Sequence, residues 1–426
     1  MNTVLYPTQD TWPELMKRPT LSMDSHAVLV KKVFDEVKID GDKAIKKFTK
    51  EFDDVDVLDL VVPAMAFVGT QKQVSKALSK AIHIAKKNIE TFHVSQVEAT
   101  HKVETMKGVC CWRESRAMNR VGLYIPGGSA PLFSTILMLA IPAQIAGCKE
   151  IIMCTPPNSE GKIDPVILFT AGLVGISTIY LVGGIQAIAG MTFGTESIPK
   201  VDKIFGPGNQ YVTAAKMEAM KYVPIDMPAG PSEVLIIADS SAVPSFVAAD
   251  LLAQAEHGAD SQVTLLSTDK KLIEKVGIEI AKQIEAMPRK EIIKKALTNS
   301  KCILFKDLQT CLTYSNGYAP EHLILATEHT EELIEDIQNA GSVFLGNYTP
   351  ESAGDYASGT NHTLPTNGYA KSYSGVSVDS FVKKITFQQI NETGLKNIGS
   401  TVELMAEAES LIAHKEAVSI RLKQLK

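Results

Sequence analysis

The middle of the chain alternates short runs of β-branched and aliphatic residues with longer stretches of helical periodicity. Residues 121–125 and 150–154 have the composition of buried strands, and 134–146 repeats its apolar positions as a helix does. Strands and helices that alternate in this way build parallel sheets. The alternation continues with a helix over 164–174, a strand over 178–182 and a helix over 184–193.

A second series of the same kind follows the turn-rich stretch 226–231. Strand patterns at 232–239 and 262–268 flank a helical pattern at 245–256. The remaining elements of this series are a helix over 271–286 and short strands over 302–305, 322–327 and 342–345. We therefore expect two α/β units side by side, joined at 226–231.

The two ends of the chain have a different pattern. Residues 26–100 are mostly helical by periodicity and charge, and 401–425 has the pattern of a single amphipathic helix. Its apolar residues on or near one face are Val402, Met405, Leu411 and Ile412. A terminal helix of this kind usually packs on its own domain or on a partner subunit, so the tail is a candidate contact surface.

Length and composition narrow the class of protein. The chain has 426 residues, of which 45% are hydrophobic and 21% charged, as in a globular protein of two or more domains. A net charge of -5 argues against a nucleic-acid or anionic-membrane partner. The six cysteines form no C-x-x-C pair, and we expect them to be reduced and mostly structural.

The N-terminus and the most apolar stretch bear on location. Residues 1–10 lack the basic start and apolar run of a secretory signal. The stretch 131–148 is interrupted by Pro142 and Gln144 and falls short of the roughly 20 apolar residues of a membrane helix. We therefore expect a cytoplasmic protein with no membrane partner.

Gln254 and His257 form the first candidate site. Because they are three residues apart, a helix places both side chains on one face. Gly258 is expected to end that helix and to leave His257 in its last turn. An amide oxygen and an imidazole there can bind a metal ion. The alternative is structural, because an imidazolium near a helix C-terminus also stabilises the helix dipole.

Glu321 and His322 form the second candidate site. A carboxylate beside a histidine offers two general bases of different strength. The pair precedes an apolar run and is expected at a strand edge, where adjacent side chains face opposite ways. Both reach one site only if Pro320 bends the chain. The alternative is a solvated start of a strand.

The third candidate site is the glycine- and serine-rich stretch 351–375, which we expect to form a long loop. Long loops without secondary structure in compact enzymes are usually functional or disordered, and Asp355 and His362 favour a functional loop here. Asp355 suits a zinc ligand, and His362 suits either a ligand or a base. Glu409 and His414 on the tail helix complete the candidates, although an isolated histidine such as His414 is typical of a protein surface.

Two glycine-rich turns, 126–129 and 206–209, each follow a strand and precede a helix. Such a turn suits phosphate binding at a helix N-terminus. Neither turn completes the G-x-G-x-x-G fingerprint. In the second turn, Tyr211 stands where the third glycine belongs. The turns alone therefore do not establish a dinucleotide site.

Seven long segments of the chain together resemble the histidinol dehydrogenase family. Six fall in order through the middle of the chain, and the seventh lies in the tail. They are RVGLYIPGGSAPLFSTILMLAIPAQIAGC, KVDKIFGPGNQYVTAAK, IDMPAGPSEVLIIAD, DLLAQAEHGADSQV, GYAPEHLIL, GDYASGTNHTLPT and AHKEAVSIRL. Because the segments are long and specific, the resemblance extends over nearly the whole chain.

The resemblance implies a fold. This fold consists of two incomplete Rossmann-like parallel-sheet domains with small N- and C-terminal helical extensions, in an intertwined homodimer. The implied bounds are 1–21 for the N-terminal extension, 22–122 with 232–376 for the α/β domain of the catalytic and zinc residues, 123–231 for the NAD-binding domain and 377–426 for the C-terminal extension. The C-terminal extension would contribute to the partner subunit's site.

The resemblance also implies roles for individual residues. One zinc ion per subunit would be bound by Gln254, His257, Asp355 and His414, the last from the other subunit. The implied substrate contacts are Ser232, Gln254, His257, His322, Asp355, His362, Glu409 and His414. The implied NAD contacts are Tyr124, Gln186 and Asn209.

The implied activity is the four-electron oxidation of L-histidinol through L-histidinal to L-histidine, with reduction of two NAD, as the final steps of histidine biosynthesis. His322 would be the main general base, and Glu321 would activate the water that attacks the aldehyde. A thiohemiacetal on the adjacent Cys110 and Cys111 is unnecessary in this scheme.

Two alternatives remain. One is a zinc hydrolase built on the same side chains, which would leave the glycine-rich turns unexplained. The other is a drifted or inactive homologue that acts on or binds another amino alcohol. An inactive homologue would be expected to have lost a base or a zinc ligand, and all of these residues are present.

Overall fold

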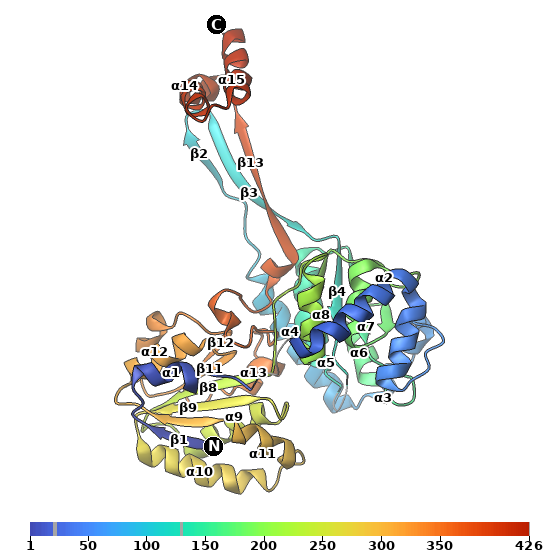
Figure 1. Cartoon of the computed structure of the whole chain (residues 1–426), viewed down its shortest axis with the longest axis vertical. Coiled ribbons are helices and arrows are strands. Elements are labelled where there is room, and N and C mark those ends of the chain that lie inside the picture. Colours follow the sequence, from blue (N-terminus) through green and yellow to red (C-terminus); the bar gives the residue numbers. More distant parts are fainter. Residues whose placement is uncertain (20–23, 128–130, 426) are drawn as a thin grey trace.

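The structure is a computed structural model that describes residues 1–19, 24–127 and 131–425. Two lobes, each built on a parallel sheet, lie side by side, and a long arm projects from them (Figure 1). The predicted class, two α/β units with parallel sheets, is confirmed. None of the described helices has the length and apolarity needed to cross a membrane.

One lobe contains a six-stranded parallel sheet in the order β1-β10-β9-β8-β11-β12. Alternate residues of strand β8 pack into two different hydrophobic cores. Val234 and Ile236 pack on one face of the sheet, and Leu235 and Ile237 pack on the other. The strands are β1 (Asn2–Leu5), β8 (Glu233–Ala238), β9 (Gln262–Ser267), β10 (Lys301–Leu304), β11 (His322–Ala326) and β12 (Ser342–Leu345). The helices are α1 (Trp12–Leu15), α9 (Pro244–Ala255), α10 (Lys270–Ile284), α11 (Lys290–Thr298), α12 (Leu308–Tyr318) and α13 (Glu351–Tyr356).

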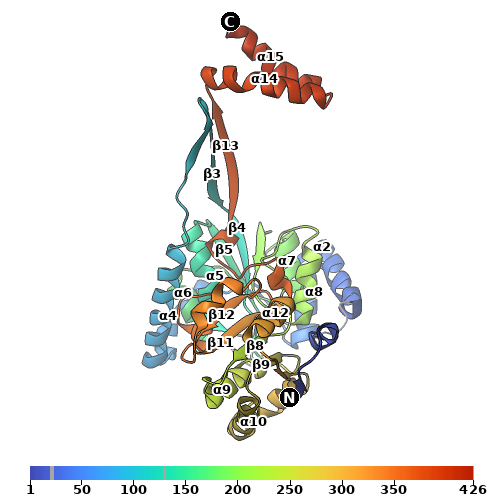
Figure 2. The same cartoon turned by 90° about the vertical axis from the view of Figure 1, so that its left-hand side faces the viewer.

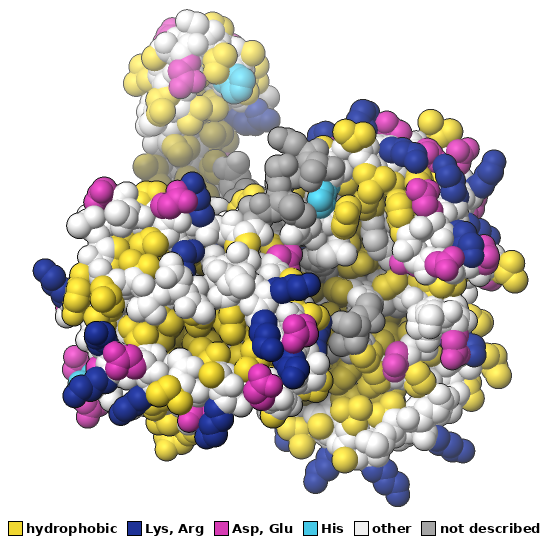
Figure 3. All heavy atoms as spheres, turned by 60° about the horizontal axis from the view of Figure 1, so that its bottom comes forward, with side chains coloured by type: hydrophobic (Ala, Val, Ile, Leu, Met, Phe, Trp, Pro, Cys, Tyr) yellow, Lys and Arg dark blue, Asp and Glu magenta, His cyan; other side chains and the backbone are white. Residues whose placement is uncertain are grey.

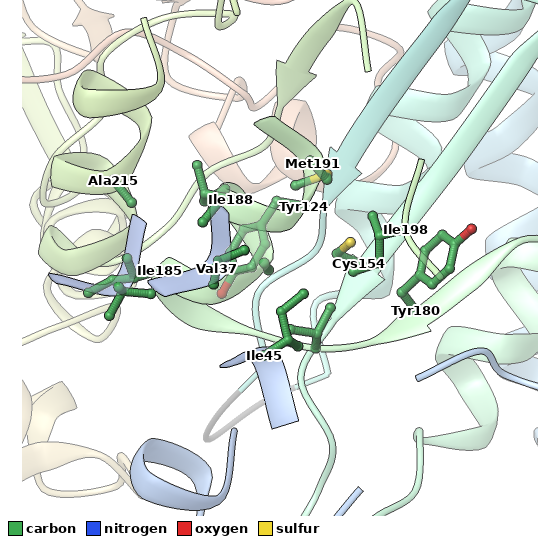
Figure 4. Packing of buried hydrophobic residues seen from close by; sticks show 14 of the residues in the cluster. Val37, Ile45, Tyr124, Cys154, Tyr180, Ile185, Ile188, Met191, Ile198 and Ala215 are labelled. Atoms are coloured by element: carbon green, nitrogen blue, oxygen red, sulfur yellow. The ribbon is translucent and has the colours of Figure 1, made fainter. Parts of the chain in front are cut away.

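The other lobe contains a four-stranded parallel sheet in the order β6-β5-β4-β7. One buried cluster joins Tyr124, Cys154 and Ile185 (Figure 4), and a second joins Leu123 to the opposite face. The strands are β4 (Arg120–Tyr124), β5 (Glu150–Thr155), β6 (Ile179–Leu181) and β7 (Lys203–Phe205). The helices are α2 (Asp24–Asp53), α3 (Thr70–Gln73), α4 (Lys76–Val94), α5 (Phe133–Ala146), α6 (Pro165–Leu173), α7 (Gly184–Phe193) and α8 (Gln210–Ala219).

The arm is a three-stranded antiparallel sheet in the order β13-β3-β2, capped by two helices at its tip (Figures 1 and 2). Its elements are β2 (Lys102–Met106), β3 (Val109–Ala117), β13 (Val382–Ile390), α14 (Glu392–Ala408) and α15 (Ile412–Gln424). The sequence analysis did not predict these strands. Most of their side chains are exposed or half-buried, so they lack a continuous apolar run.

The tail is not the single helix that the sequence predicted over 401–425. The chain reverses between α14 and α15 at Ser410, whose φ of 59° lies in the left-handed region. An α-helix cannot continue through a residue in that conformation. The two helices fold back on each other as a hairpin.

The packing differs from the predicted division into domains. Residues 22–122 were expected with the catalytic domain, but α2 packs on α7 of the four-stranded lobe and α4 packs on α5. The expected N-terminal extension 1–21 instead adds β1 to the edge of the six-stranded sheet. An amphipathic helix covers whichever apolar sheet face the tertiary fold leaves open, and periodicity does not identify that sheet.

The second glycine-rich turn passes close to the backbone of Tyr124, and Gly206 makes this close approach possible. It has a φ of 127°, and an added Cβ would overlap the backbone carbonyl oxygen of Tyr124. Gly206→Ala is therefore expected to lower the free energy of unfolding by about 3 kcal/mol or more. Gly277→Ala is the matched control, because nothing lies within 4 Å of that Cβ in α10. The control is expected to gain up to about 1 kcal/mol. Urea denaturation of both variants measures the difference, and equal midpoints would contradict the prediction.

Candidate active site

A cavity of about 330 Å³ lies between the two lobes. The four-stranded lobe contributes Tyr124 at the carboxyl end of β4 and Asn209 at the start of α8. The six-stranded lobe contributes Ser232 before β8, and the Glu321–His322 pair at the amino end of β11. Ligand sites are common at such junctions between domains.

Glu321 and His322 both line this cavity, so the chain does bend in the way that a site shared by the two side chains needs. The bend that the sequence assigned to Pro320 begins one residue earlier, because Ala319 has a φ of 54° in the left-handed region. His322 is 3% exposed, and its Nδ1 lies 3.2 Å from the backbone oxygen of Glu233. Donation from Nδ1–H to that carbonyl leaves Nε2 as the basic nitrogen. The backbone therefore selects the tautomer that a general base needs.

Glu321 is held from two sides. Its Oε2 accepts a hydrogen bond from the backbone N–H of Glu233 at 2.8 Å and one from Nε2 of Gln254 at 3.3 Å. Since Glu233 N–H orients Glu321 and Glu233 C=O orients His322, one residue of β8 positions both candidate bases. Glu233 itself forms a buried bidentate ion pair with Arg18, which keeps this part of β8 in place.

Gln254 and Asp355 bring two buried oxygens to the cavity. Gln254 Oε1 and Asp355 Oδ1 have no hydrogen-bond partner among the described residues, and Asp355 Oδ1 lies 3.4 Å from His322 Nε2. His257 also lines the cavity but lies beyond the end of α9 rather than in its last turn. Asp355 lies on α13, so the predicted loop over 351–375 begins with a short helix.

His362 bridges the two lobes at this cavity. Its Nδ1 lies 2.9 Å from the backbone oxygen of Asp355, and its Nε2 lies 3.1 Å from Oγ1 of Thr135 on α5. The sequence did not single out Thr135, because a threonine inside an apolar helix carries no chemical signal of its own. The structure thus connects the histidine from the expected loop to the four-stranded lobe.

The charges of these groups are coupled. Burial lowers the pKa of His322, but the carboxylate of Glu321 and the contact with Asp355 outweigh burial and raise this pKa well above its usual value. Burial raises the pKa of Asp355, but the imidazole of His322 outweighs it and holds the pKa below its usual range. Burial lowers the pKa of His362. A positive charge between Asp355 and His322 is therefore favoured, whether proton or metal ion.

Asp250 lies one turn before Gln254 on α9, and burial raises its pKa to about 7. Because an unfolded aspartate has a pKa of about 3.9, its charge costs almost no stability at pH 4. The cost grows as the pH rises from about 4 to about 7 and is constant at higher pH. Asp250→Asn should therefore raise the free energy of unfolding by about 2 kcal/mol at pH 8 and by much less at pH 4.5, after allowance for partial solvent contact. Urea titrations at both pH values measure this. An equal gain in the free energy of unfolding at both pH values would contradict the raised pKa of Asp250. Glu274→Gln, on the surface of α10, is the control.

A second cavity of about 690 Å³ adjoins the first, and both are lined by Tyr124, Gly127 and Asn209. Asn209 caps α8, accepting hydrogen bonds from the N–H groups of Tyr211 and Val212. The Tyr124 hydroxyl accepts a hydrogen bond from Gly184 N–H at the start of α7. Gly128 and Ser129 of the first glycine-rich turn lie outside the described residues.

Gln186 differs from the other predicted cofactor contacts. Its side chain is fully buried and is not part of either cavity wall. Its Nε2 donates a hydrogen bond of 3.4 Å to Oδ2 of Asp53, which does line the second cavity. The sequence did not single out Asp53, because it is one carboxylate among many at the charged end of a helix.

Glu409 and His414 are not brought to the cavity within one chain. They lie at the junction and the start of the two tail helices, at the tip of the arm (Figures 1 and 2). Within residues 1–19, 24–127 and 131–425 of a single chain, no three His, Cys, Asp or Glu side chains gather closely enough to hold a metal ion.

Known proteins of one family match this chain over nearly its full length. The model of the family described as histidinol dehydrogenase matches residues 16–422. The chain belongs to the histidinol dehydrogenase family. A histidinol dehydrogenase of Bacteroides thetaiotaomicron is 56% identical over 427 residues, with 100% of both chains covered. One of Escherichia coli strain K12 is 48% identical, with 98% of this chain and 96% of the relative covered.

A solved structure is equally similar. The crystal structure of histidinol dehydrogenase from Elizabethkingia anophelis has a TM-score of 0.97 and 56% sequence identity, covering 100% of this chain and 98% of that chain. The histidinol dehydrogenase family assignment makes the chain an oxidoreductase and resolves the choice against the zinc hydrolase that the sequence left open.

Proposed function

We propose that the protein oxidises L-histidinol through L-histidinal to L-histidine at the cavity between the lobes, with zinc and two NAD, as the final steps of histidine biosynthesis. The single observation that carries this proposal is the arrangement of His322. Its imidazole is buried and oriented by Glu233 C=O, and Nε2 has no hydrogen-bond partner among the described residues. With a cation beside Asp355 in place of a proton on Nε2, this nitrogen is available to take a proton from a bound alcohol.

In the first oxidation, His322 Nε2 accepts the hydroxyl proton of L-histidinol. The hydrogen on the adjacent carbon leaves with its electron pair as hydride, and the alcohol becomes an aldehyde. NAD supplies the acceptor for that hydride. The cavity lies between two lobes, which favours retention of the reactive aldehyde.

Water then adds to the aldehyde. Glu321 takes a proton from the water as its oxygen bonds to the carbonyl carbon, and the carbonyl oxygen takes the proton that His322 had accepted, which gives a gem-diol and returns His322 to its neutral form. In the second oxidation His322 accepts a hydroxyl proton of the gem-diol as the second hydride leaves, and the product is the carboxylic acid. The two bases sit close enough to act in turn, with Nδ1 of His322 and Oε2 of Glu321 3.6 Å apart.

The donor set at the cavity suits zinc. Gln254 Oε1 and Asp355 Oδ1 are buried oxygens without a partner among the described residues, and His257 adds an imidazole. The fourth ligand in the proposal is His414 of the partner subunit. Bound there, zinc would orient the nitrogens of the substrate and polarise its hydroxyl group. A cation beside Asp355 would offset part of the negative charge that raises the pKa of His322. Nε2 would then be free of a proton.

The arm supports a shared site in a homodimer. The tip of the arm exposes hydrophobic side chains (Figure 3), among them Leu404, Met405, Leu411, Ile412 and Ile420. A monomer rarely exposes such a cluster on a projecting element, and a second copy of the chain would cover it. In the same assembly, Glu409 and His414 of one chain would reach the cavity of the other.

The test is NADH formation from L-histidinol and NAD by the purified protein. Two NADH per L-histidinol, lost on chelation and restored by zinc alone, are the expected result. No NADH from folded, zinc-loaded protein would overturn the proposal. A panel of other amino alcohols would then test the second candidate, a homologue with a different substrate.

A further inference from the structure

The second cavity has an unusual charge for a nucleotide site. Its wall carries the carboxylates of Glu51 and Asp53, both from the end of α2. No lysine or arginine is among the described residues that line it. A site for a phosphate group normally offers cations or helix N-termini, so this end of the cavity suits an uncharged, hydroxyl-bearing group.

The two cavities together give a bound dinucleotide its direction. The hydride acceptor must lie near His322, in the first cavity. The shared wall contains Tyr124 and Asn209, and the N-termini of α7 and α8 open beside them. Helix N-termini attract phosphate, so the pyrophosphate belongs at this shared wall. The adenosine half is then left for the second cavity, where Asp53 lies.

Asp53 is held in one position by a buried neighbour. Its Oδ2 accepts the 3.4 Å hydrogen bond from Gln186, whose side chain is fully buried and has no direct access to the cavity. Among the described residues no lysine or arginine forms an ion pair with Asp53. At the C-terminus of α2 the helix dipole also disfavours a carboxylate, so Asp53 has no evident role in stabilising that helix.

We propose that Asp53 determines the preference of this enzyme for NAD over NADP. Its carboxylate accepts a hydrogen bond from a ribose hydroxyl of the adenosine half and repels a 2′-phosphate, which carries about -1.5 to -2 charges. Gln186 is a positioning residue for Asp53, because its buried side chain lines neither cavity and hydrogen-bonds the carboxylate. The inference rests on the proposed use of NAD and adds the residue that selects between the two dinucleotides.

The test compares Asp53→Asn with Asp54→Asn, which makes the same change of charge one residue away. Asp54 is exposed, is not part of the cavity wall and has a φ of 55°, which asparagine tolerates. With L-histidinol saturating, wild type is expected to prefer NAD by at least about 100-fold in kcat/KM. Asp53→Asn should reduce that preference at least about tenfold, through both a better NADP rate and a poorer NAD rate. The control should stay within about twofold of wild type.

An unchanged preference in folded Asp53→Asn would overturn the inference. Because that variant could fail to fold, a second measurement uses wild-type protein alone. Calorimetry with 5′-AMP and with adenosine 2′,5′-bisphosphate is expected to give at least about tenfold tighter binding of 5′-AMP. Equal or tighter binding of the bisphosphate would also overturn the inference. Absence of any NADH from wild type would instead count against the proposed function, and the calorimetric comparison would still decide the role of Asp53.

Discussion

His322→Ala is expected to lower kcat with L-histidinol and NAD by about 10²- to 10⁴-fold, the usual contribution of a general base. Oxidation of added L-histidinal should fall as well, because the same nitrogen takes the proton in both steps. Zinc content should stay at the wild-type level, since Gln254, His257 and Asp355 remain in place. NADH formation with each substrate and metal analysis of the same preparation measure the three quantities.

The control for this variant is His329→Ala, which removes an imidazole at the exposed start of a short 3-10 helix away from the cavity. It should retain wild-type turnover. Unchanged turnover in folded His322→Ala would refute the base assignment. Loss of zinc together with activity would instead make His322 a metal ligand, which is a different role for the same side chain.

His414→Ala is expected to weaken zinc binding at least about 100-fold and to abolish turnover at limiting zinc, because one of four ligands is lost. The structure allows a test of which chain supplies this ligand. His414 lies on α15, which Figure 1 shows at the tip of the arm, away from the two lobes whose residues line the cavity. The proposal therefore requires that each site combine the cavity of one chain with the tail of another.

Co-expression of His322→Ala and His414→Ala chains tests this arrangement. At limiting zinc each variant alone is expected to have almost no activity, but a mixed dimer contains one intact site, made of the His414→Ala cavity and the tail of the His322→Ala chain. Random pairing should restore about 25% of wild-type activity, because half the dimers are mixed and each has one working site of two. No restoration in a mixed dimer isolated with two affinity tags would contradict a shared site. Full zinc content in His414→Ala would refute its role as a ligand.

Much of the two lobes could be predicted from the local pattern. The strand at 121–125 and the helix at 184–193 match β4 and α7 to within a residue, because strand and helix periodicities depend on near neighbours. The predicted helix over 164–174 begins at Asp164, whose side chain caps α6 by accepting a hydrogen bond from Val166 N–H. The spacing of Gln254 and His257, and the adjacency of Glu321 and His322, also marked side chains that the structure brings to one cavity.

What the sequence by itself determined, then, was the type of each element in the lobes and most of the chemistry at the cavity. Only the tertiary structure decided that α2 covers the four-stranded sheet, that Ala319 turns Glu321 and His322 into one cavity, and that Gln186 stands behind Asp53. It also decided that residues 102–117 and 382–390, far apart along the chain, pair into an arm that carries His414 away from its own cavity. The physical reason is the same in each case. Periodicity reports the local environment of a residue, whereas the partner of an apolar face, a strand edge or a polar side chain depends on contacts between segments that are distant in sequence.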